Sequence, residues 1–76
     1  MILPTKHVST RASLLGLGAV ILSELGEPRT VTSLWDRLRG REDVGPFSRF
    51  VLALDLLHML SAVELRDGLI ARNRRD

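Results

Sequence analysis

The sequence predicts a small, mainly helical fold that ends in a two-stranded β-hairpin. Two long apolar segments free of proline indicate two of the helices, because each is bounded by residues that cap or stop a helix. The pair Asp67-Gly68 between two short segments indicates the hairpin, because aspartate and glycine suit a tight type I′ turn. A chain of 76 residues offers little interior, so we expect one domain over residues 1–76.

The first helix is expected to follow an extended start. Residues 1–8 contain Pro4, and a proline disfavours helix at the residue before it. Ser9 or Thr10 can then cap a helix that runs to about Leu25. A glycine and a proline follow at once, as is typical of a helix end.

The middle of the chain predicts a short strand and a second helix. Residues 29–31 fit a very short strand, and Thr32 or Ser33 can cap a helix over residues 34–39 that closes at a glycine. Four apolar side chains of this stretch are expected to point inward: Val31, Leu34, Trp35 and Leu38.

The last part of the chain predicts a third helix and the two strands of the hairpin. A third helix is expected over residues 47–60, and the hairpin strands over residues 62–66 and 69–72. Helix, short strand, helix, helix and two-stranded wing is the order of a winged-helix domain. We therefore expect that fold.

Composition excludes several classes of protein. The chain contains no cysteine, which rules out a disulfide scaffold and a cysteine zinc site. Its longest uncharged segment, residues 12–23, is too short to cross a membrane, which needs about 20 apolar residues. The same segment is not followed by a signal cleavage site, so a secretory signal is not expected. The absence of cysteine favours a cytoplasmic protein.

No pattern of catalytic or metal-binding residues is visible. His7 has no acidic neighbour, and His58 is expected near the inward edge of its helix, in a structural or interface role. Gly16 and Gly18 do not form a phosphate-binding loop, because no lysine follows them and they lie in a helical segment. We expect neither an enzyme nor a cofactor.

The third helix is apolar on two sides. One side, centred on Phe50 and Leu57, is the expected core face. On the opposite side Leu52, Leu56 and Met59 follow an i, i+4, i+7 spacing, where a DNA-reading helix would carry polar residues. This second stripe either contacts another protein or a second copy of the chain, or is buried under residues 1–3 or the wing.

The first helix has a side made of small residues. Ala12, Gly16, Ala19 and Ser23 line it, opposite the large apolar side chains. Small side chains allow another backbone to approach closely. This side therefore receives either the chain's own hairpin or N-terminal segment, or a helix of a partner.

Basic residues suggest only weak contact with DNA. The formal net charge is +2, and the bases around the second helix are offset by nearby acids. The predicted phosphate-facing patch lies around the wing and tail, with one arginine of the third helix. Its candidate residues are Arg49, Arg66, Arg72, Arg74 and Arg75.

Several segments together resemble middle component 6 of prokaryotic ABC three-component systems. They are ILPTKHV (2–8), SLLGLGAVIL (13–22), EPRTVTSLWDRLR (27–39), RFVLALDLLHMLSAVEL (49–65) and DGLI (67–70). The resemblance implies a winged-helix subunit encoded between an SMC or Rad50-like ATPase and an effector, in systems that act against phage or plasmids. It carries over no catalytic residue.

These observations favour a non-enzymatic adaptor. The expected partners are an SMC or Rad50-like ATPase and an effector subunit, with a homodimer as a further option and no membrane contact. The main alternative is a winged-helix DNA-binding repressor that uses Arg49 and the wing arginines. An antitoxin-like binder of a partner protein is a third hypothesis, which the sequence does not distinguish from the first.

Overall fold

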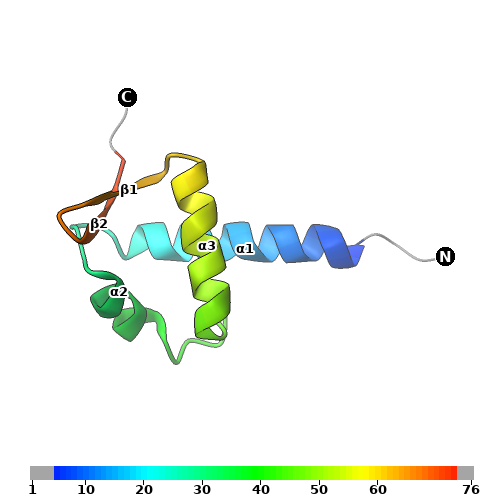
Figure 1. Cartoon of the computed structure of the whole chain (residues 1–76). Coiled ribbons are helices and arrows are strands. Elements are labelled where there is room, and N and C mark those ends of the chain that lie inside the picture. Colours follow the sequence, from blue (N-terminus) through cyan, green and yellow to red (C-terminus); the bar gives the residue numbers. More distant parts are fainter. Residues whose placement is uncertain (1–4, 74–76) are drawn as a thin grey trace.

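The protein contains three helices and one β-hairpin (Figure 1). The structure is a computed structural model that describes the backbone of residues 5–73 and the side chains of residues 13–73. No helix in this part of the chain has the length and hydropathy needed to cross a membrane. The elements are α1 (Thr5–Ser23), α2 (Val31–Leu38), α3 (Phe47–Met59), β1 (Val63–Arg66) and β2 (Leu69–Arg72).

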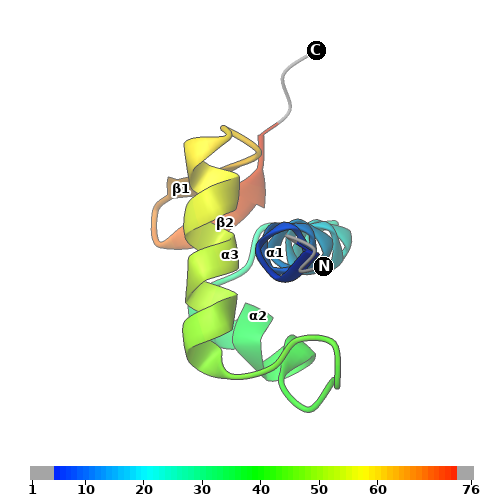
Figure 2. The same cartoon turned by 90° about the vertical axis from the view of Figure 1, so that its right-hand side faces the viewer.

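The helices form an elongated arrangement. α3 crosses α1 near its middle, while α2 and the hairpin lie toward the C-terminal end of α1 (Figure 1). Viewed along α1, the two longer helices lie side by side (Figure 2). The N-terminal part of α1 runs past the other elements, so the radius of gyration is 13.2 Å, compared with about 11 Å for a compact chain of this length.

The core lies where α1, α2, α3 and the hairpin meet. Trp35, Phe47 and Phe50 form one aromatic cluster there, with ring centroids 5.1–5.7 Å apart. Buried apolar side chains come from every element and from the loop between α2 and α3. They are Leu17, Ile21, Leu25, Leu34, Leu38, Val44, Phe50, Ala53, Leu57, Val63 and Ile70.

The hairpin confirms the winged-helix prediction. β1 and β2 are antiparallel, and Asp67 and Gly68 both have positive φ (56° and 78°), as a type I′ turn requires. On the other side of β2, Arg29 and Ile70 exchange two backbone hydrogen bonds, of 3.0 and 2.6 Å. The segment between α1 and α2 thus joins the hairpin at β2, which gives the fold its winged-helix-like order.

The predicted start of the first helix was wrong. Residues 5–8, expected to be extended, are helical, and the helix ends at Ser23 rather than at about Leu25. A proline disfavours helix only at the residue before it and is compatible with a first helical turn, so Pro4 does not prevent a helix from starting at Thr5. The expectation for residues 1–4 lies outside the described part of the chain.

The predicted strand at residues 29–31 was also wrong in extent. Only Arg29 pairs with the hairpin, and Val31 is already the first residue of α2. Thr30, rather than Thr32 or Ser33, caps this helix, because its Oγ1 accepts a 3.0 Å hydrogen bond from the Ser33 N–H. Val31 is consequently exposed, whereas Leu34 and Leu38 are buried and Trp35 is half-buried, as expected.

Ion pairs hold the connections between the helices. Arg37 of α2 donates a 2.8 Å hydrogen bond to the Glu24 carboxylate just after α1, and this bond lowers the pKa of Glu24. In the loop before α3, Arg41 binds both Asp43 carboxylate oxygens at 3.1 Å, and these bonds lower the pKa of Asp43.

We expect these two carboxylates to make stability depend on pH. A carboxyl group whose pKa is lower in the folded chain stabilises the fold above its unfolded pKa, here 4.5 for Glu24 and 3.8 for Asp43. That contribution is lost as the pH falls through the lowered values. The Tm should therefore fall modestly on acidification, since both pairs are exposed, and fall less in the variant Glu24→Gln/Asp43→Asn. Thermal unfolding at several pH values, followed by circular dichroism, tests this. An equal fall of the Tm with pH in the wild type and the double variant would contradict it.

Removing the central aromatic ring should destabilise the fold strongly. Phe50 is fully buried and contacts Trp35 and Phe47. Phe50→Ala is expected to cost about 3–5 kcal/mol, a large share of the roughly 5–15 kcal/mol typical of small proteins. Urea unfolding measures this. The control is Phe47→Ala, which removes an exposed ring of the same cluster and should cost clearly less.

Candidate protein-interaction surface

The side of α3 that faces away from the core is apolar and exposed. Phe50, Ala53 and Leu57 are buried, which turns the opposite side of the helix outward. There Leu52 is 56% exposed and Met59 is 78% exposed, while Leu56 is half-buried. We call Leu52, Leu56 and Met59 the outer stripe. The wing therefore leaves Leu52 and Met59 uncovered.

The polar residues near the outer stripe do not suit a DNA reader. Ser48 and Asp55 are the exposed polar residues between the stripe and the cleft side of α3. A carboxylate repels phosphate, and leucine or methionine side chains recognise little on a base edge beyond a thymine methyl group. This side of α3 is therefore better suited to a protein than to a DNA groove.

Arg49 connects three parts of the chain. Its Nη1 donates to the carbonyl oxygens of Asp43 (2.9 Å) and Val44 (2.6 Å), and its Nη2 donates to the carbonyl (3.1 Å) and hydroxyl oxygens of Ser13 in α1. Both terminal nitrogens thus bind protein oxygens. A phosphate contact by Arg49 stays a prediction, and its geometry favours a structural role.

The hairpin arginines do not form a joint patch. Arg66 lies beside the turn and binds Glu64 at 2.9 Å, whereas Arg72 lies opposite Val63 at the other end of the hairpin. Side chains alternate along a strand, and paired residues share a face, so Arg66 and Arg72 point to opposite faces. Arg74 and Arg75 lie outside the described residues.

The arginines around α2 are all engaged in ion pairs. Their partners are Glu24 for Arg37, Asp36 for Arg39 and Asp43 for Arg41. This agrees with a solvated, charge-balanced surface. One of the three partners, Glu24, lies just after α1 and is far from Arg37 in the sequence.

The small-residue side of α1 is open to solvent. Gly16, Ala19 and Ser23 are exposed, and a Cβ added at Gly16 would have no atom of the described chain within 4 Å. The hairpin therefore does not occupy this side. The side chain of Ala12 is outside the described set.

The two predicted interface patches lie on different faces. The small residues lie on the exposed side of α1, and the outer stripe lies on the side of α3 away from the core. Figure 2 shows the two helices next to each other. A single docked helix would cover one patch or the other.

Gly18, rather than Gly16, is the position of close helix packing. It is buried, and a Cβ there would lie 3.0 Å from Leu57 Cδ2 of α3. The sequence did not indicate this packing position, because a glycine within the large-residue side does not stand out from its neighbours. Docking of a partner helix on the small-residue side stays a prediction.

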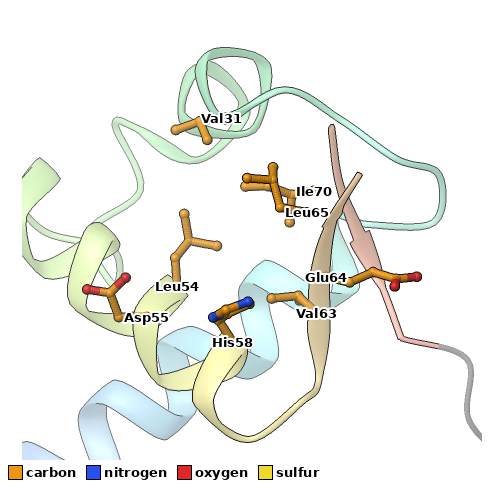
Figure 3. Close-up of a pocket in the computed structure, with 8 residues that line it drawn as sticks. All are labelled: Val31, Leu54, Asp55, His58, Val63, Glu64, Leu65 and Ile70. Carbon is orange, nitrogen blue, oxygen red and sulfur yellow. The ribbon is translucent and has the colours of Figure 1, made fainter. Parts of the chain in front are cut away.

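A cleft that the sequence analysis missed separates α3 from the hairpin. It encloses about 240 Å³ (Figure 3). His58 lines it and is exposed, so the predicted position near the inward edge of the helix was wrong, and its structural or interface role stays a prediction. The cleft combines residues of α2, α3 and both strands, so no single segment carries a signal for it. The lining residues are Val31, Leu54, Asp55, His58, Val63, Glu64, Leu65 and Ile70.

The fold is that of a small, winged-helix-like protein, and one side of its third helix exposes apolar side chains. The family model of the ABC-three component (ABC-3C) system Middle Component 6 matches residues 3–73. The chain therefore belongs to this family, which confirms the resemblance seen in the sequence and implies a role in that multi-component system. No curated protein and no solved structure matches it.

Alanine substitutions at Gly16 and Gly18 should have different effects on stability, because Gly16 is open to solvent and Gly18 packs against α3. Alanine is favoured over glycine in a helix by about 1 kcal/mol, so Gly16→Ala should stabilise the protein by up to about that amount, since nothing obstructs the new methyl group. Gly18→Ala should gain less or lose stability, because the methyl group meets Leu57 at 3.0 Å. Urea unfolding of both variants tests this, and an equal gain at both positions would contradict it.

Proposed function

We propose that the protein is a non-enzymatic adaptor that acts in the cytoplasm and docks on the ABC ATPase component of its system, an SMC or Rad50-like protein. The outer stripe is the docking surface. Membership in a middle-component family supports a role between other components. The exposure of Leu52 and Met59 is the observation that carries the proposal.

The geometry of the outer stripe suits a helical partner. An i, i+4, i+7 spacing places three side chains along about 10 Å of one helix face. Fully burying one such side chain is worth about 1.5–3 kcal/mol, and these residues are already partly covered, so three of them supply only part of the free energy that association requires. The apolar positions of a coiled coil, which long ATPases of this kind contain, offer a matching surface.

The system's proposed role is defence against phage or plasmids, as the family resemblance implied. In this role the ATPase binds nucleotide and the effector acts, while the adaptor joins them. A second copy of the chain is a competing occupant of the outer stripe.

DNA binding as a repressor is the second candidate function. Arg72 favours it, because this exposed guanidinium forms no ion pair with any residue of the described part of the chain. The bonds of Arg49 and the carboxylate of Asp55 on α3 weigh against it. The adaptor function therefore has the stronger support.

A charge in the outer stripe should abolish docking. We expect Leu52→Glu and Met59→Glu each to reduce co-purification with the co-expressed ATPase at least about tenfold, because a buried unpaired carboxylate is costly. Leu56→Glu is less decisive, because this side chain is half-buried in the fold. Circular dichroism should show that the first two variants remain helical.

The matched control is Leu15→Glu. Leu15 lies on α1 and is 52% exposed, close to the 56% of Leu52, so it receives the same change at similar exposure on another face. Docking through the outer stripe would be contradicted if Leu15→Glu reduced co-purification as much as Leu52→Glu does. It would also be contradicted if neither Leu52→Glu nor Met59→Glu reduced co-purification. Sequence-selective DNA binding that persists at physiological salt and is lost in Arg72→Ala would support the repressor function instead.

A further inference from the structure

The cleft between α3 and the hairpin is small and apolar. Leu54 of α3 and Val63 and Ile70 of the hairpin form its inner wall, and Val31 at the start of α2 closes one side (Figure 3). Its volume of about 240 Å³ is below the roughly 300–1,000 Å³ of pockets that hold small organic ligands. The cleft is therefore of a size for one bulky side chain rather than for a nucleotide.

The rim of the cleft leaves apolar surface in water. Val31 and Leu65 are both exposed although they border the cleft. The strand register places Leu65 opposite Ile70, and Val63 lies on the same hairpin face two residues earlier. This face therefore presents aliphatic side chains on the wall and on the rim, where an inserted apolar group would contact both.

The charged residues of the cleft are acidic. Asp55 and Glu64 line it, and no lysine or arginine does, in a chain with net charge +2. Arg66 already binds the Glu64 carboxylate, which points away from His58 in Figure 3. Asp55 is exposed and forms no ion pair with any residue from 13 to 73. It is thus the carboxylate available to a ligand.

We propose that this cleft binds a segment of a partner protein in which a bulky apolar residue lies beside a lysine or arginine. The apolar side chain enters between Leu54 and the hairpin, and the basic group pairs with Asp55. An anionic ligand is disfavoured by the unpaired Asp55 carboxylate. This proposal rests on the proposed adaptor function, because it takes the ligand to be part of a partner protein.

The position of Asp55 relates the cleft to the outer stripe. Asp55 precedes Met59 by four residues and follows Leu52 by three, so all three side chains are neighbours on α3. The cleft lies on one side of Asp55 and the outer stripe on the other. The two surfaces are adjacent but chemically distinct, and each can be tested alone.

Three small probes with one aromatic ring and different charges test the site. The full-length ¹⁵N-labelled chain is titrated at constant pH with 2-phenylethylamine, 2-phenylethanol and 3-phenylpropionate, and amide resonances are followed by NMR. The amine should shift residues around Leu54, His58, Val63 and Ile70. We expect it to bind about two- to fivefold more tightly than the alcohol, as one exposed ion pair allows, and the carboxylate to bind most weakly.

Matched variants identify the carboxylate. Asp55→Asn should abolish the advantage of the amine over the alcohol, and Asp36→Asn, the same change at an exposed aspartate of α2, should leave it intact. The spectra themselves report whether each variant is folded. Equal effects of both substitutions, absence of shifts around the cleft, or binding of the carboxylate as tight as that of the amine would overturn the proposal.

The result is separable from the test of the adaptor function. Leu52→Glu should leave the amine-dependent shifts at the cleft unchanged, because Leu52 does not line it. Amine binding at the cleft without loss of co-purification in Leu52→Glu would support the cleft and reject the outer stripe. The reverse pattern would reject the cleft alone.

Discussion

The close approach of α1 to α3 at Gly18 determines which sides of both helices are buried. A side chain at this position would meet Leu57 at 3.0 Å, so glycine lets the helices come together there. The contact orients α3 with Phe50 and Leu57 toward the core. As a result, Leu52 and Met59 of the outer stripe are exposed. After α3 the chain turns into the hairpin, and the Ala62 N–H donates a 2.8 Å hydrogen bond to the Leu57 carbonyl oxygen.

Features of the fold that depend on neighbouring residues could be predicted from the sequence. The turn at Asp67-Gly68 is specified by two residues with unusual backbone freedom, and the two-sided apolar pattern of α3 follows from helical periodicity. The same pattern predicted that Leu52 and Met59 lie opposite the core face at Phe50. It left open whether another part of the chain covers them, and the structure shows both side chains exposed.

The sequence could not predict features that depend on a choice between equivalent cap residues or on contacts between distant segments. Thr30, Thr32 and Ser33 are all suitable caps, and the pairing of Arg29 with Ile70 decides among them by holding the chain extended up to Thr30. The bonds of Arg49 go to main-chain oxygens and one hydroxyl, a set with no sequence signature. The cleft combines four elements and became visible only with the fold.

The bonds of Arg49 also affect how the protein would meet a partner. They join α1, the loop before α3 and α3 itself in the unbound molecule, so the conformational entropy of that loop is already lost on folding. Docking on α3 would not have to order this region again. Encounter with a partner would then resemble the meeting of two rigid bodies, for which mutual orientation limits the association rate rather than rearrangement of the chain.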